Sequence, residues 1–119
     1  MFPTLSRLGL VAALGAGLCA AEQKTLSGYL VDKACSADTI KKGEKAAKEH
    51  GVDCALMEDC AKSGYGVLTA DGKYITFDAA GNKRAVAALK ASKKQNDIKV
   101  TVTGDQTGDS VKVATLKVN

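Results

Sequence analysis

The sequence contains no tryptophan, one proline and one histidine. The proline is Pro3, so no proline-rich linker divides the chain. The motifs C-x-x-C and H-E-x-x-H, a glycine-rich phosphate loop and paired carboxylates are all absent. These absences exclude the common zinc-knuckle, thioredoxin-like, zinc-protease and phosphate-binding signatures.

The chain also carries little net positive charge. The formal net charge is +4, and the lysines are interleaved with glutamate and aspartate. A nucleic-acid-binding domain usually carries a dense basic stripe, which this pattern does not provide. We therefore expect no nucleic-acid partner.

The first 21 residues have the pattern of a secretion signal. Arg7 precedes an apolar run over residues 8–18, and small residues end the segment. A signal peptide has this order, and the run is too short for a comfortable membrane span. We expect a signal peptide over residues 1–21, a single domain over residues 22–119, and a periplasmic or extracellular location without a stable membrane span.

Beyond the signal, apolar alternation and turn residues predict five strands separated by helices. The expected strands cover residues 25–32, 65–70, 73–77, 98–103 and 111–118, and the expected helices cover residues 36–50, 54–62 and 82–94. This order matches a mainly β, α+β domain: a small five-stranded OB-like barrel with a cysteine-bearing helical insertion after strand 1 and a helix between strands 3 and 4. A plain α+β sandwich is the alternative.

Local signals refine this expectation. Asp71-Gly72 favours a hairpin with a type I′ turn. Asp53 and Asn82 are placed to cap the second and third helices. The apolar parity of the last strand slips between Val113 and Leu116, which predicts a β-bulge.

Three thiols and the only imidazole lie within 26 residues. They are Cys35, His50, Cys54 and Cys60. Three sulfurs and one nitrogen form a plausible tetrahedral set for zinc. Met57 lies three residues from two of these cysteines, and a thioether beside thiolates and imidazole suits copper(I). Zinc or copper is therefore the cofactor that the cluster would bind.

The same cysteines also allow a disulfide, because an exported protein meets an oxidising environment. Signal removal leaves three cysteines, so one intramolecular bridge forms at a time, from Cys35 to either Cys54 or Cys60. The closed loop of about 20 to 26 residues is worth roughly 3 kcal/mol in the chain-entropy model. The remaining thiol allows either a monomer or a disulfide-linked dimer. A thiol beside a disulfide could also exchange with it, which would give a redox protein.

Aromatic residues offer a different kind of site. Tyr65, Tyr74 and Phe77 lie on the hairpin that corresponds to the binding face of OB-type modules, where they could stack on a base, a sugar or a peptide. The alternative is that Phe77 belongs to the core and that the tyrosines are half-buried strand residues.

The segment HGVDCALMEDC, which spans residues 50–60, runs into SGYGVLTADGK and is framed by GYLVDKAC and KVTVTGDQTGDSVKV. With these strings the chain resembles a family of small exported bacterial proteins that has no established activity. The resemblance covers nearly all of residues 22–119. It marks the Cys/His segment without assigning it any chemistry, and the similarity of the β pattern to periplasmic OB-fold modules concerns the fold alone.

These observations favour an exported, non-enzymatic binding or accessory module that is stabilised by a disulfide and takes an unknown small ligand, metal or protein partner. One alternative is a periplasmic protein that handles copper or zinc with the Cys/His cluster. Another is a thiol redox protein.

Overall fold

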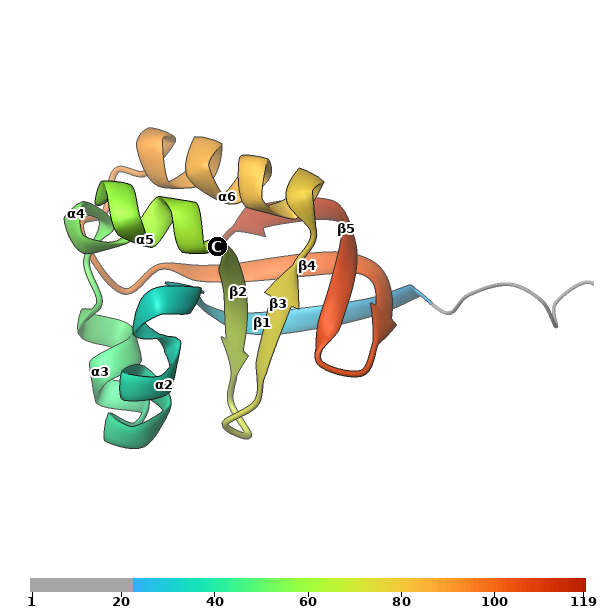
Figure 1. The fold of residues 1–119 in the computed structure, drawn as a ribbon, viewed down its shortest axis with the longest axis horizontal. Coiled ribbons are helices and arrows are strands. Elements are labelled where there is room, and N and C mark those ends of the chain that lie inside the picture. The colour runs from blue at the N-terminus through green and yellow to red at the C-terminus, as the bar shows by residue number, and fades with distance from the viewer. Residues whose placement is uncertain (1–22) are drawn as a thin grey trace, which may run out of the picture.

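A five-stranded mixed sheet and five helices form the part of the chain that the computed structural model describes, residues 23–119 (Figure 1). The strands are β1 (Gln23–Asp32), β2 (Tyr65–Thr69), β3 (Tyr74–Phe77), β4 (Lys99–Thr107) and β5 (Ser110–Val118). The helices are α2 (Lys33–Lys42), α3 (Glu44–Glu49), α4 (Val52–Ala55), α5 (Glu58–Ser63) and α6 (Ala79–Ala91). The expected α+β class and element order are confirmed, whereas the predicted signal peptide lies outside the described residues.

The strand pairings run in a closed circuit, β1-β2-β3-β5-β4, with β4 pairing back to β1. The β3–β5 pair is parallel and the other pairs are antiparallel. β1 serves two neighbours because its first part pairs with β4 and its last part pairs with β2. Gly28 lies where the two pairings overlap, and a Cβ atom there would overlap the carbonyl oxygen of Leu68. Only glycine allows the two backbones to approach so closely.

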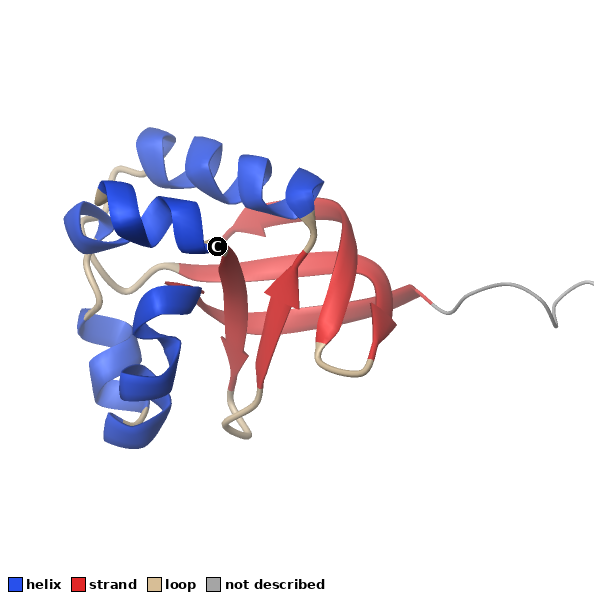
Figure 2. Ribbon diagram, in the orientation of Figure 1, coloured by secondary structure: helices blue, strands red, loops and turns tan. Residues whose placement is uncertain are grey.

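The main core lies inside this sheet, where α6 and α4 close it (Figure 2). Its buried residues are Leu30, Val52, Ala55, Tyr65, Val67, Ile75, Phe77, Ala85, Leu89, Ile98, Val100, Val102, Val111 and Val113. Most of them come from alternate strand positions and from one face of α6, as amphipathic elements require. Val52 and Ala55 come from α4, and Ile98 directly precedes β4.

A second, smaller cluster lies on the other face of β1 and β2. Tyr29, Val31, Leu68 and Ala47 are buried there, and Cys35 and Tyr74 pack against them. Neighbouring residues of a strand point to opposite faces, so Tyr29 and Val31 belong to this cluster while Leu30 belongs to the main core. Ala47 comes from α3, so the helical insertion covers the outer face of the sheet.

The predicted helices of the insertion are each divided into two. Gly43 has φ +93° and separates α2 from α3. The helix expected over residues 54–62 is wrong as one unit, because Leu56 and Met57 separate α4 from α5. Asp53 is inside α4 and does not cap a helix.

The remaining local expectations have mixed outcomes. α6 begins before Asn82, because the Asp78 side chain caps it by accepting a hydrogen bond from the Gly81 amide, 3.0 Å away. The hairpin at Asp71-Gly72 is confirmed, but a type I′ turn needs two residues with positive φ and only Gly72 has one. The bulge in β5 is confirmed by a shift in the β4–β5 register.

Candidate functional site

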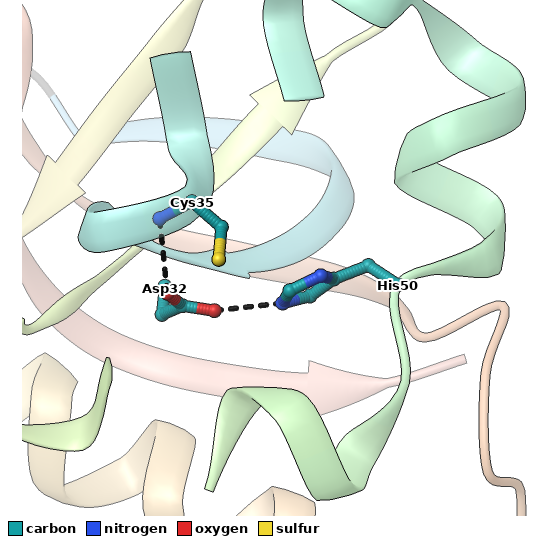
Figure 3. A group of neighbouring side chains, drawn as sticks. All are labelled: Asp32, Cys35 and His50. Carbon is teal, nitrogen blue, oxygen red and sulfur yellow. Dashed lines mark hydrogen bonds and ion pairs between the residues drawn. The ribbon is translucent and has the colours of Figure 1, made fainter. Parts of the chain in front are cut away.

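Three side chains that could hold a metal ion converge where β1 ends and α2 begins. They are Asp32, Cys35 and His50 (Figure 3). One donor atom from each residue lies within 4.8 Å of the donor atoms of the other two. The group therefore combines an oxygen from the end of β1, a sulfur from the first turn of α2 and a nitrogen from the residue that follows α3.

Asp32 is the centre of this group. It is the last residue of β1 and the N-cap of α2, and its carboxylate Oδ2 accepts a hydrogen bond from the Cys35 backbone amide at 3.1 Å. The other oxygen, Oδ1, lies 2.7 Å from Nε2 of His50. The side chain of Asp32 has no exposed surface, and that of His50 is 10% exposed. A carboxylate buried to this degree needs partners of this kind, because an unpaired buried charge is strongly unfavourable.

The backbone on both sides of His50 is fixed by the segment that leads into β4. The Asp97 amide donates to the carbonyl of Lys48 at 2.7 Å, and the Val52 amide donates to the carbonyl of Gln95 at 2.7 Å. Asp97 has φ +58°, a left-handed conformation that is uncommon outside glycine. Strained backbone of this kind often accompanies a functional site.

Cys60, on α5, lies 4.4 Å from Cys35, and the two are not joined by a disulfide. Ser63 fixes this arrangement, because its hydroxyl donates to the Cys60 carbonyl at 2.6 Å and accepts from the Ala34 amide at 3.0 Å. The Lys33 amide also donates to the carbonyl of Gly64 at 2.8 Å. The start of α2 is thus tied to the end of α5.

The charge of Asp32 governs the neighbouring thiols. Burial raises the pKa of Asp32, but the hydrogen bond and charge of His50, with the bonds from Cys35, outweigh burial and hold the pKa below its usual value. Burial and the Asp32 charge raise the pKa of Cys35 to about 12, and they also raise the pKa of Cys60. Both thiols are therefore protonated at neutral pH unless a cation enters, which is unfavourable for a thiolate nucleophile.

Of the four predicted ligands, Cys35 and His50 belong to the three-residue group, and Cys60 lies outside that group but beside Cys35. Cys54 is exposed on α4 and is not part of the group. Met57, which suggested copper, is 59% exposed. The break between α4 and α5 explains why the expected grouping fails. A single helix over residues 54–62 would have fixed the directions of Cys54, Met57 and Cys60 relative to one another, and the break changes these directions.

Sequence reasoning missed Asp32, which replaces Cys54 in the group. The available signal was an aspartate directly after an apolar strand and three residues before Cys35, which is an N-cap position. Placing the start of the helix at Ser36 concealed it, since α2 begins at Lys33.

The predicted aromatic surface is not exposed. Tyr65 is 1% exposed and Phe77 is 7% exposed, and both belong to the main core. The Tyr65 hydroxyl donates to the Ala55 carbonyl at 2.6 Å, and the Tyr74 hydroxyl donates to the Val31 carbonyl at 2.8 Å. Tyr65 thus joins the sheet to the helical insertion, Tyr74 joins β3 to β1, and these rings offer no stacking platform for a ligand.

A separate pocket of about 260 Å³ lies between the α2–α3 turn and the sheet. Its walls include Ile40, Ala47 and Leu68, and Tyr29 and Lys99 also line it. The ammonium of Lys99 lies 5.4 Å from the centre of the Tyr29 ring, a cation–π distance. The pocket thus combines apolar walls with one cation, Lys99, and one carboxylate, Glu44.

Comparison of the chain with protein-family models, with curated proteins and with solved structures gives no match. Among the described residues, no helix has both the length and the apolar character needed to cross a membrane.

Proposed function

We propose that this protein is an exported zinc-binding domain that holds the ion with Asp32, Cys35 and His50, and with Cys60 as the fourth ligand. The observation that carries the proposal is the convergence of three donor atoms within 4.8 Å of one another. Export is supported by the pattern of residues 1–21.

The donor set favours zinc over copper. One carboxylate oxygen, one imidazole nitrogen and two sulfurs are all ordinary zinc ligands, and four of them suit tetrahedral coordination. Copper(I) prefers soft sulfur ligands, and the thioether of Met57 is exposed instead of contributing to the cluster. The buried carboxylate of Asp32 is a hard ligand that zinc accepts readily.

The charges in the cluster also fit a cation. Asp32 and His50 share a proton between Oδ1 and Nε2, and an ion coordinated by both atoms takes the place of that proton. A cation also reverses the effect of the Asp32 charge on the neighbouring thiols and allows them to ionise. Binding therefore releases protons, as it does in other sites with thiolate ligands.

The test is metal binding by the reduced full chain, with Co²⁺ as a spectroscopic probe and Zn²⁺ followed by native mass spectrometry. We expect one ion per chain and a tetrahedral Co²⁺ spectrum with thiolate charge-transfer bands. His50→Ala and Asp32→Asn should each weaken binding at least about tenfold, in line with losses at other metal sites. Cys54→Ser is the matched control and should bind as the wild type does.

Two results would contradict the proposal. The first is a reduced, folded wild-type chain that binds neither ion in the micromolar range. The second is a Cys54→Ser variant that loses as much affinity as His50→Ala. Circular dichroism of each variant separates loss of the site from loss of the fold.

We also propose that the closed circuit of strands is an OB-like barrel. The strand order and the position of α6 between β3 and β4 support this assignment. Under this assignment, the segment from α2 to α5 is an enlarged loop between the first two strands.

The pocket between the α2–α3 turn and the sheet supports a second candidate function, the binding of a small apolar or aromatic ligand. Ile40 is 43% exposed at the pocket, and Lys99 and Glu44 are the charged residues that line it. The fluorescent probe 1-anilinonaphthalene-8-sulfonate has this chemistry and should bind to the native chain. Ile40→Asp should abolish the fluorescence gain, and an unchanged gain would contradict this function.

A further inference from the structure

The three cysteines of the described chain have different surroundings. Cys54 is exposed, whereas Cys35 and Cys60 are partly buried and lie 4.4 Å apart on α2 and α5. The thiols of this pair interact with each other and with Asp32. Proximity of this kind marks the pair, and not Cys54, as able to react within the chain.

The two helices that carry the pair are held at fixed positions. The Ser63 hydroxyl connects the Ala34 amide to the Cys60 carbonyl, and Gly64 accepts from the Lys33 amide. The residues that make these three hydrogen bonds lie within two positions of Cys35 or within four positions of Cys60 along the sequence. Because a disulfide requires the two sulfurs at about 2 Å, the remaining approach is a matter of side-chain rotation and a small helix shift.

We infer that Cys35 and Cys60 are a redox modification site, which closes reversibly as a disulfide and thereby releases the bound metal. The release part of this inference rests on the proposed zinc function, whereas formation of the disulfide does not. The pair thus has two exclusive states, a dithiolate that holds an ion and a disulfide that does not.

The reaction partner is a disulfide-exchanging oxidant, RSSR. One cysteine loses its proton to solvent, attacks a sulfur of RSSR and expels one RS⁻, and the second cysteine loses its proton, attacks the resulting mixed disulfide and expels the other RS⁻. Two electrons pass from the cysteine pair to the oxidant. From the free dithiol, the two thiol protons end on two RSH. From the metal form, the ion leaves as M²⁺ and two solvent protons complete the RSH.

Oxidation removes both sulfurs from the ligand set and leaves Asp32 and His50. Two ligands do not hold zinc in a protein site at the affinity that four give. Conversely, a bound ion occupies both sulfurs and protects them from the oxidant. Linkage requires the two effects to match, so the bound ion raises the reduction potential of the disulfide by the same free energy by which oxidation weakens metal binding.

The experiment equilibrates the full chain with mixtures of oxidised and reduced glutathione, blocks free thiols with an alkylating agent, and maps the products by mass spectrometry. Without metal, we expect loss of two hydrogens, a Cys35–Cys60 cross-link and alkylation of Cys54. Saturating Zn²⁺ should move the midpoint toward more oxidising mixtures. The oxidised chain should bind Zn²⁺ at least about tenfold more weakly than the reduced chain.

Cys60→Ser and Cys54→Ser form a matched pair of variants. Cys60→Ser should abolish the internal cross-link, whereas Cys54→Ser should leave it unchanged.

The inference is overturned if all three thiols remain free in the most oxidising mixture, or if Cys54 is the partner of Cys35. Equal Zn²⁺ affinity of the two forms would overturn the release step. If the Cys35–Cys60 cross-link forms but the chain does not bind zinc in either form, the proposed zinc function is refuted, whereas the redox modification site is supported.

Discussion

The interior of the sheet and the helical insertion are stabilised in different ways. Fourteen buried residues fill the main core, and only Val52 and Ala55 of these come from the insertion, on α4. Four residues form the cluster beneath α2 and α3, and α5 contributes no buried residue. Apolar burial therefore stabilises the sheet, while the insertion depends on a few contacts and on hydrogen bonds such as those of Ser63 and Tyr65. Regions with few buried contacts open more readily than the rest of a domain. The candidate ligands thus lie mainly on the less stable part of a stable framework.

The largest effect should come from the sheet interior. Leu89 is 2% exposed on α6, and Leu89→Ala should lower the free energy of unfolding by about 2–5 kcal/mol, because it leaves a cavity in the core. Urea denaturation measures the loss. Ile40→Ser, at an exposed position of the insertion, is the control and should change stability far less.

Bound Zn²⁺ should stabilise the helical insertion and so change the difference in stability between the insertion and the sheet. At a free Zn²⁺ concentration of 100 times Kd, binding adds about 2.7 kcal/mol to the free energy of unfolding. Hydrogen exchange should show the added protection from local opening in residues 33–64. If protection rose in β4 and β5 alone, the ion would be bound elsewhere.

Acid should weaken the insertion through Asp32. Its native pKa lies below the unfolded value, so its contribution to stability is present above pH of about 4 and disappears as the pH falls through the native pKa. Asp32→Asn keeps a capping side chain but loses the charged bond to His50, at a cost of about 1–3 kcal/mol. Unfolding measured from pH 7 to pH 2 should show a smaller acid-dependent loss in the variant than in the wild type.

The smallest effect should come from Cys54. The side chain is exposed on α4, so Cys54→Ser should change the free energy of unfolding by less than about 0.5 kcal/mol in reducing buffer. Thermal unfolding is a sufficient measurement. A larger loss would mean that this thiol contributes to packing or to the metal site.

Strong local patterns predicted much of the sheet. The alternation of Ile98, Val100 and Val102 with polar residues marked a half-buried strand. Val100 and Val102 are buried in β4, and Ile98 is buried directly before the strand begins. β4 nevertheless continues through Gly104, beyond the expected strand end at residue 103, and the close approach of the Lys112 carbonyl favours glycine at this position within the strand. Turn residues therefore located the hairpins better than they located strand ends.

The candidate site could be predicted only in part. Cys35, His50 and Cys60 were recognisable as ligand types, but their grouping depends on Gly43 and on the break at Met57, which set the directions of four short helices. The tertiary partner of each side chain is not encoded in spacing along the chain. Asp32 illustrates this point, since its capping role is local but its contact with His50 spans 18 residues.

The direction of β1 has a practical consequence for handling the protein. The strand has ten residues, so Gln23 lies up to about 30 Å from Asp32, at the opposite end of the sheet from the candidate metal site (Figure 1). An affinity tag or surface tether joined ahead of Gln23 therefore leaves the site accessible to ions and oxidants. Asn119, in contrast, lines the pocket beside Lys99, so a tag fused after it would crowd that pocket. Immobilisation through the N-terminal side is the geometry that keeps both surfaces open.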